Sequence, residues 1–432
     1  MENRYKESIK WLERAKKVIP SASQTYSKSY RYYCEGAAPA FIDHGLGSHV
    51  WDVDGNEYVD FVLALGPITL GHNDTAINAA IVNQLEKGII FSLPATLEVE
   101  LAEKLAEIIP CAEMVRFVKN GSDATTVAIR LARAYSGKDL VLSCGYHGMQ
   151  DWYIGSTENN LGVPDCVRKM IKTFPYNNLD ALEKLISEYK KQIAAIIMEP
   201  VRVEEPEEGY LQGVRMLADK HGIVLIFDEV VTGFRLALAG AQGYYGVIPD
   251  IAAYGKGMGN GMPISAVVGK EDIMKLADNG AFISLTFGGE ALSLAAGLAT
   301  ITELKKRNVF SHTRKLGLQL KEGAQKLVSD YDLNEIVTVK GTTVMPGLFF
   351  NSCSGYSAND VMALFQQETF LGGVFFLGVN YLCASHTDAD ITQALESYRS
   401  ALDAVKKLRD GAPLEKLLKG KSFRPIFARN KH

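Results

Sequence analysis

Short, wholly apolar stretches separated by amphipathic ones dominate the middle of the 432-residue chain. Runs of this length without polar residues are typical of strands buried on both faces of a sheet. Between them apolar residues recur at helical spacing, as at Val127, Leu131 and Ala134. The alternation predicts an α/β fold with a mainly parallel sheet covered by helices. The predicted strands are 114–118, 140–143, 193–198, 223–227, 250–254 and 265–268, and the predicted helices are 122–135, 211–221 and 291–305.

The pattern changes towards both ends of the chain. Helices there are longer, and strands are fewer and mixed with polar residues. We expect residues 66–307 to form a large domain, and residues 308–432 to form a smaller α+β domain that packs with an N-terminal segment, 1–65. The predicted helices of these regions are 7–18, 75–86, 97–109, 313–331 and 391–408, and the predicted strands are 40–42, 49–52, 335–339, 347–350 and 373–377.

Composition narrows the class of protein. Lys and Arg number 46 against 50 Asp and Glu, so the net charge of −4 gives no electrostatic reason to expect a nucleic-acid partner. No apolar run reaches membrane-spanning length, and the charged N-terminus has no signal-peptide pattern. The six scattered cysteines include no CxxC pair, which predicts reduced thiols rather than disulfides or a zinc site. We expect a cytoplasmic enzyme or binding protein without a metal.

An acid and a lysine follow two of the predicted strands. Asp228 ends one apolar strand in IFDEVVTGFR, and Lys256 lies in the glycine-rich turn YGKGMGNG after another. Side chains at the carboxyl ends of strands in an α/β sheet point into the crevice where such sheets bind ligands. Pyridoxal 5'-phosphate (PLP) chemistry needs this pair, because a lysine forms a Schiff base with the cofactor aldehyde and a carboxylate keeps the pyridine nitrogen protonated. The glycine-rich turn lacks the order of a nucleotide-binding loop.

The stretch Asn120-Gly121-Ser122-Asp123 follows a strand and opens a helix. Free N–H groups and the helix dipole make such an end an anion site, and Gly121 lets a phosphate approach closely. An ordinary helix cap explains the same residues when they are considered alone.

Three further residues lie at predicted strand ends. Tyr146 is an aromatic that can stack on a planar ring, although packing explains a single tyrosine equally well. Glu199 places a carboxylate at the same edge, or merely ends its strand. If Asp228 faces the cofactor, alternation turns Glu229 away and returns Val230 to the cofactor side.

In combination these motifs resemble class III aminotransferases of PLP fold type I, and in particular their glutamate-1-semialdehyde aminomutase-like members. The resemblance rests on VWDVDGNEYVDF, LGHND, KNGSDATTVAIRLAR, GYHG, MEPV, IFDEVVTGFR, YGKGMGNGMP, TFGGEALSLAAGLAT and ASHT, in this order.

The resemblance implies a role for each matching residue. Lys256 would be the Schiff-base lysine and proton shuttle, and Asp228 the partner of the pyridine nitrogen. Tyr146 and Val230 would enclose the ring, with Glu199 as a nearby polar support. The phosphate would be bound by Gly121 and Ser122 and by Thr286 of a second subunit, which implies a homodimer. The reactants would be a small-molecule amino donor and a carbonyl acceptor.

Two departures from the aminomutase pattern concern the substrate. Lys28 stands where aminomutases carry a substrate-binding arginine, and Gly378 stands where they carry a glutamate. An aminomutase must retain its intermediate, so these departures favour an aminotransferase that moves an amino group from a donor such as glutamate to an aldehyde or ketone. The alternatives are an aminomutase and a catalytically silent PLP-fold binding protein, although the latter predicts loss of Lys256 or Asp228. The segment TYSKSYRYY (25–33) can line a pocket for a sugar-like acceptor, or can be a packed surface segment.

Overall fold

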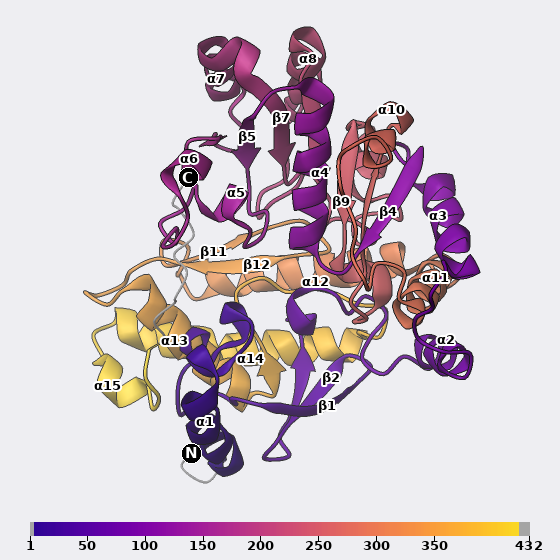
Figure 1. The fold of residues 1–432 in the computed structure, drawn as a ribbon. Coiled ribbons are helices and arrows are strands. Elements are labelled where there is room, and N and C mark those ends of the chain that lie inside the picture. Colours follow the sequence, from indigo (N-terminus) through magenta and orange to yellow (C-terminus); the bar gives the residue numbers. More distant parts are fainter. Residues whose placement is uncertain (1–3, 423–432) are drawn as a thin grey trace. The chain divides into compact units, whose positions relative to one another are not determined.

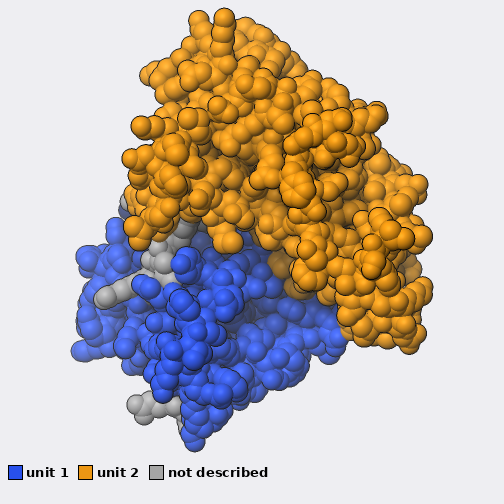
Figure 2. All heavy atoms as spheres, in the orientation of Figure 1, with its two compact units in different colours: residues 1–65, 70–74, 311–428 blue, residues 66–69, 75–310, 429–432 orange. Residues whose placement is uncertain are grey.

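The computed structural model describes residues 4–422 and divides them into two compact units (Figures 1 and 2). Among the described residues, unit 1 comprises 4–65, 70–74 and 311–422, and unit 2 comprises 66–69 and 75–310.

Unit 2 contains a seven-stranded sheet with the order β4-β10-β9-β8-β7-β5-β6 (Figure 1). Strand β10 runs antiparallel to both neighbours, and the other pairs are parallel. Every residue of the five strands β5 and β7 to β10 is buried, which explains why apolar residues dominate their sequences. The strands are β4 (Met114–Val118), β5 (Leu140–Cys144), β6 (Ile171–Thr173), β7 (Ile193–Met198), β8 (Val224–Asp228), β9 (Ile251–Tyr254) and β10 (Ser265–Gly269).

Helix α4 (Gly121–Ser136) lies across one face of this sheet (Figure 1). Ala124, Ala128 and Leu131 pack there against strand residues such as Ile197 and Ile226. The helix ends at Gly137 in the left-handed conformation, a common C-terminal cap. The other helices of unit 2 are α2 (Thr75–Leu85), α3 (Thr96–Ile108), α5 (Asp151–Ile154), α6 (Asp165–Arg168), α7 (Leu179–Tyr189), α8 (Tyr210–His221), α9 (Gly240–Tyr245), α10 (Glu271–Met274) and α11 (Ala291–Lys306).

Unit 1 has a four-stranded sheet with the order β1-β2-β3-β13 and a separate β11-β12 hairpin. Its core contains many aromatic side chains, including Tyr58, Phe370 and Phe375, which meet edge to face. The strands are β1 (Ile42–Leu46), β2 (His49–Asp52), β3 (Glu57–Asp60), β11 (Val337–Lys340), β12 (Gly347–Phe350) and β13 (Val374–Phe375). The helices are α1 (Lys6–Val18), α12 (Val309–Asp330, which begins in unit 2), α13 (Ala358–Leu371), α14 (Asp388–Arg409) and α15 (Leu414–Leu417).

The structure differs from the sequence prediction at several elements. Helices α7 and α13 were not predicted, although α7 is amphipathic and capped by Asn178. Helix α13 lacks a polar face because Gln366 and Gln367 are buried with its apolar residues. Strand β1 lies at Ile42–Leu46 instead of 40–42, because its exposed residues pair with β2 in a hairpin and carry no buried apolar run.

One further property of the described residues bears on membrane insertion. Between residues 4 and 422, none of the helices combines the length and the apolar character needed to cross a bilayer.

Candidate active site

The strand order of unit 2 gathers four predicted site residues at one edge of the sheet. Strands β9, β8, β7 and β5 are neighbours and run parallel, so their carboxyl ends lie side by side. Asp228 is the last residue of β8, and Glu199 directly follows β7. Tyr146 and Lys256 follow β5 and β9 by two residues. Residues more than a hundred positions apart in the chain therefore converge, as expected of a parallel sheet.

Asp228 is held by a histidine that sequence reasoning left unassigned. Its carboxylate is buried, and Oδ2 lies 2.7 Å from Nδ1 of the buried His147. The other oxygen, Oδ1, accepts the backbone N–H of Val230 at 3.1 Å. Strand alternation places Asp228 on the same face as Ile226, which packs under α4. The pair fixes the orientation of the carboxylate, and no sequence signal identifies the two partners, which are 81 positions apart.

Val230 lies between two glycines that close the site. A Cβ on Gly121 would lie 2.8 Å from Cγ1 of Val230, and one on Gly255 would lie 3.5 Å from the same atom. The valine therefore contacts the first residue of α4 and the residue before Lys256. Only small residues leave room for this approach.

The N-terminus of α4 has backbone N–H groups that are available to bind an anion. Asn120 is the cap, since its Oδ1 accepts the N–H of Asp123 at 3.0 Å. Ser122 is therefore not needed as the cap. The Oγ of Ser122 accepts the N–H of Met149 at 3.3 Å. Within the part of the chain that the structure describes, the N–H groups of Gly121 and Ser122 have no acceptor, as is usual at a helix start. A phosphate group fits such an end.

Glu199 supports the loop that carries Tyr146. Its Oε2 accepts the Tyr146 N–H at 3.0 Å, and it lies 3.6 Å from Nε of Arg202. Gly145 has φ +122°, and a Cβ there would lie 2.6 Å from the same oxygen, so glycine is required. The Tyr146 side chain is 45% exposed, which leaves a ring face available for stacking.

Lys256 has an unusual backbone conformation. It is half-buried and begins a 3-10 turn, Lys256–Gly259, with φ +34°. Positive φ is rare for a long side chain and marks strain that the surroundings must enforce. Gly257 beside it approaches Thr69 closely, where a Cβ would lie 2.9 Å from Cγ2. The turn directs a strained lysine to the edge of the sheet that carries Asp228.

Glu229 faces away from this group, as alternation predicts. Its carboxylate accepts the N–H groups of Ala241 and Gln242, each at 2.8 Å, and the hydroxyl of Thr232. Burial raises the pKa of Glu229 to about 7. Glu229 therefore anchors the start of α9. Among the described residues, no three His, Cys, Asp or Glu side chains form a metal-binding set.

Two further predicted residues lie on other segments of the chain. Thr286 is exposed on a loop of unit 2, and Lys28 is exposed on a 3-10 turn of unit 1. Within the segment 25–33, Tyr33 is buried against Phe370 and Phe375 and serves the core.

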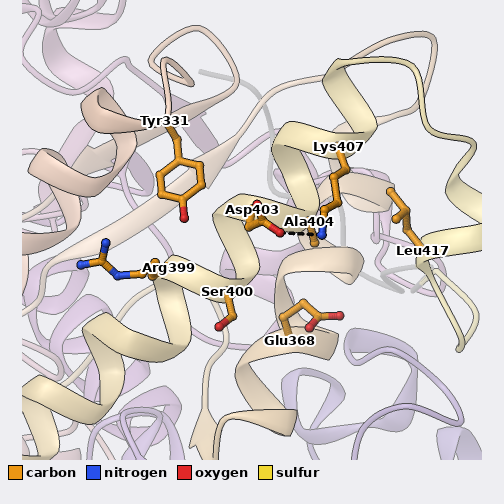
Figure 3. A pocket seen from close by; sticks show the side chains of 8 residues that line it. All are labelled: Tyr331, Glu368, Arg399, Ser400, Asp403, Ala404, Lys407 and Leu417. Carbon is orange, nitrogen blue, oxygen red and sulfur yellow. Dashed lines mark ion pairs between the residues drawn. The ribbon is translucent and has the colours of Figure 1, made fainter.

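A surface groove in unit 1 of about 420 Å³ contains none of the predicted residues (Figure 3). Arg399, Asp403 and Lys407 of α14 line it together with Tyr331. Asp403 and Lys407 form an ion pair at 2.6 Å, so their charges are already matched. The groove therefore does not contain the lysine and carboxylate pair that the sheet edge of unit 2 carries.

The sheet-edge residues fit PLP. A buried carboxylate, a helix N-terminus with free donors and a strained lysine match the pyridine nitrogen, the phosphate and the aldehyde of that cofactor. The fold is that of PLP-dependent transferases of fold type I. The FumI protein of Sphingopyxis sp. MTA144, solved with PLP, superimposes with a TM-score of 0.86 at 28% identity over 96% of this chain and 100% of that chain. An omega-transaminase from Sphaerobacter thermophilus gives 0.83 at 26% identity over 92% and 98%.

The chain belongs to the class III aminotransferases, since the family model matches residues 32–379. The 3-aminobutyryl-CoA aminotransferase of Cloacimonas acidaminovorans is 37% identical over 93% of this chain and 98% of that protein. The glutamate-1-semialdehyde 2,1-aminomutase of Methanothrix thermoacetophila is 36% identical over 90% and 94%. These findings confirm the resemblance, the fold class and the cofactor, PLP. The protein is a PLP-dependent aminotransferase or aminomutase.

Proposed function

We propose that the protein is an aminotransferase that takes an amino group from an amino-acid donor and gives it to an aldehyde or ketone. Glutamate is the first donor to test. The observation that carries the choice over an aminomutase is Gly378. Its φ of +93° favours glycine, and its carbonyl accepts the N–H of Leu348 at 2.9 Å. A glutamate at this position would strain the backbone, so the carboxylate that helps an aminomutase retain its intermediate is missing.

The proposed roles follow from the contacts described above. When bound, PLP supplies an electron sink for the carbon that loses a proton. Lys256 Nζ would take that proton from the substrate carbon and pass it to a carbon of the cofactor, because a positioned amine is an effective general base. Asp228, oriented by His147, would bind the pyridine nitrogen. Tyr146 and Val230 cover the ring faces and exclude water.

The phosphate and the substrate are assigned to other residues. In the proposal Gly121 and Ser122 donate to the phosphate, Glu199 fixes the loop of Tyr146, and Lys28 binds the carboxylate or another anionic group of the substrate. Tyr26, which is 53% exposed, can contribute a hydroxyl for a sugar-like acceptor.

The names of the relatives extend the set of substrates to test. One relative acts on 3-aminobutyryl-CoA, and a solved structure with the same fold is a β-phenylalanine aminotransferase. Both names place the amino group on the third carbon. An amine of this kind is therefore the second donor class in the proposal. An aminomutase acting on a glutamate-semialdehyde-like compound remains the alternative, because several relatives carry that name.

We also propose a homodimer. Unit 2 exposes a run of large apolar side chains on and after α2, where Val82, Leu85, Phe91 and Leu93 are 48% to 79% exposed. Phe282 and Phe287, which flank Thr286, are 77% and 57% exposed. Exposed apolar surface of this extent is typical of a protein interface. A second copy of the chain would cover it and bring Thr286 to the phosphate of its neighbour.

The visible absorption spectrum tests the proposed reaction. The PLP band of the purified protein should bleach with a single donor and release the matching keto acid. A Lys256→Ala variant is the control, and its band should not respond. A band that no α- or β-amino donor changes would favour the aminomutase, and absence of the band after addition of PLP would contradict the role of Lys256.

A further inference from the structure

An ion pair in unit 2 joins the start of the proposed phosphate-binding helix to the end of the loop that carries Thr286. Lys119 directly precedes the cap of α4, and its Nζ lies 3.1 Å from Oε2 of Glu290. The two side chains are only 19% and 13% exposed, so solvent screens the pair less than it screens surface pairs.

Glu290 is held firmly on its own side. As the cap of α11, its carboxylate accepts the N–H groups of Leu292 at 2.7 Å and Ser293 at 3.2 Å, and the Ser293 hydroxyl at 2.5 Å. Burial by itself would raise the pKa of Glu290. The hydrogen bonds from Ser293 and Lys119 outweigh burial and hold the pKa below its usual range. The carboxylate is ionised at neutral pH and keeps Lys119 in place.

The rest of the loop is fixed to the same part of unit 2. Arg130 of α4 donates to the carbonyl of Phe282 at 2.8 Å, and Arg116 of β4 donates to the carbonyl of Ile283. At the other end, a Cβ on Gly289 would lie 2.4 Å from Oε1 of Glu98. The exposed Thr286 therefore lies on a segment with contacts at both ends. Its start is bonded to β4 and α4, and its end lies against α3.

We propose that Lys119 and Glu290 form a positioning pair that sets the place of Thr286 relative to the α4 N-terminus of the same subunit. The inference rests on the proposed function, in which Thr286 donates to the phosphate of the neighbouring subunit. Each subunit then uses its own phosphate helix to hold the hydroxyl that its neighbour's cofactor needs. The geometry of the phosphate site in one subunit then depends on the start of α4 in the other subunit.

Glu290→Gln tests this inference, because the direction of the change in PLP affinity distinguishes two roles of Lys119. If Lys119 acts only through its charge, loss of the opposing carboxylate strengthens PLP binding. If the pair positions Thr286, PLP binding weakens, and we expect the dissociation constant to rise about tenfold, equivalent to 1.4 kcal/mol. Lys119→Met should give a similar rise, and the double variant should add little, because both changes break one contact.

Pyridoxal without the phosphate separates positioning from general damage. A positioning effect raises the dissociation constant of PLP and leaves that of pyridoxal unchanged, whereas loss of α11 stability raises both. The matched control is Glu303→Gln, which removes the carboxylate that pairs with Arg307 at 2.6 Å at the other end of α11 and should change neither constant. Equal changes for the two ligands, or tighter PLP binding, would overturn the inference.

Thr286→Val distinguishes failure of this inference from failure of the shared phosphate site. If Thr286→Val weakens PLP binding and Glu290→Gln does not, the positioning role is wrong and the shared site stands. If Thr286→Val has no effect on PLP binding, both are wrong.

Discussion

Gly121 and Val230 show how closely the backbone of α4 approaches the candidate site. A Gly121→Ala change would place a methyl group 2.8 Å from Cγ1 and 3.0 Å from Cγ2 of Val230. Overpacking of this kind costs about 1–3 kcal/mol. We expect PLP affinity, measured by titration of the apoprotein, to fall correspondingly. In a Val230→Ala background, which has its own lower affinity, the added Gly121→Ala change should cost little. An equally large further loss would show that Val230 is not the obstacle.

The contact between His147 and Asp228 gives a second prediction. His147→Phe keeps a ring where the imidazole lies parallel to Trp152 but removes the 2.7 Å hydrogen bond to the carboxylate. A hydrogen bond to a charged group contributes about 1.5–3 kcal/mol. We expect kcat to fall about 10- to 100-fold with PLP still bound. His221→Phe, at the exposed end of α8, should leave kcat unchanged.

The positions of single residues at strand ends were predictable from sequence, whereas their roles in cofactor binding stay predictions. Asp228, Glu199 and Lys256 follow apolar runs, and alternation correctly turned Glu229 away from the site. His147 received no role from the sequence, because its partner Asp228 is 81 positions away. The roles of Lys28 and Thr286 also stay predictions. The contacts on which they depend are determined neither by the sequence nor by unit 2 alone.

Helix α12 gives a prediction about an element. Gly317 lies against the backbone of residue 343, where a Cβ would be 1.6 Å from the carbonyl oxygen of Thr343. Backbone cannot move aside as a side chain can, so Gly317→Ala should lower the melting temperature strongly or prevent folding. Gly323→Ala in the same helix meets only the tip of Leu395, and the better helix propensity of alanine offsets that contact. Its melting temperature should change little; equal effects would contradict the assignment.

The start of α14 makes the stability of unit 1 depend on pH. Asp390 accepts from Thr387 N–H at 2.8 Å and from Ser48 Oγ at 3.0 Å, and contacts His49 at 3.1 Å. Burial raises the pKa of Asp390, but the His49 and Thr387 hydrogen bonds bring it to about 2. A lowered carboxyl pKa stabilises the fold above the unfolded value, near 4, and the stabilisation is lost as the pH falls to about 2.

The corresponding experiment compares melting temperatures across that range. Asp390→Asn should be less stable than the parent chain at pH 6, by about 2 kcal/mol of unfolding free energy. The difference should shrink towards pH 2. A difference that stays constant with pH would show that the charge is not the cause.

His49 titrates in the opposite sense. The hydrogen bond with Asp390 raises the pKa of His49 above 6.5. Its stabilising contribution is therefore complete at low pH and is lost as the pH rises through the folded-state pKa.

Elements were predictable where one physical signal dominates. Strands 114–118, 193–198 and 347–350 coincide with β4, β7 and β12, because short runs dominated by apolar residues have few alternatives. Helix α13 was missed because its polar residues Gln366 and Gln367 are buried in the core, where Nε2 of Gln366 donates to the backbone carbonyls of Tyr32 and Phe376. Tertiary contacts of that kind leave no periodic signal.

At the scale of the whole molecule, the proposed dimer gives a prediction about assembly. Leu93 is 79% exposed on the segment between α2 and α3. Leu93→Glu places a charge in the proposed interface, where an unpaired buried charge is costly. We expect sedimentation to show a shift towards monomer and PLP to be lost more readily. Met216→Glu, 70% exposed on α8, is the control and should stay dimeric. An unchanged dimer with Leu93→Glu would place the interface elsewhere.

The family was predictable from the whole chain because nine motifs in a fixed order leave little room for chance. The substrate was not, since similar scaffolds serve different reactants. Relatives with names as different as 3-aminobutyryl-CoA aminotransferase and glutamate-1-semialdehyde aminomutase share more than a third of their residues with it.

The position of β10 between β4 and β9 has a consequence for synthesis on the ribosome. Strand β4 leads directly into α4, and its neighbour in the sheet, β10, is translated roughly 150 residues later. At about 5–20 residues per second, β4 is translated roughly 7–30 s before that partner. Because β10 also contacts α4, the sheet beside that helix stays incomplete until β10 emerges. A chain that ends before residue 265 lacks this part of the sheet, and we expect it to be colourless.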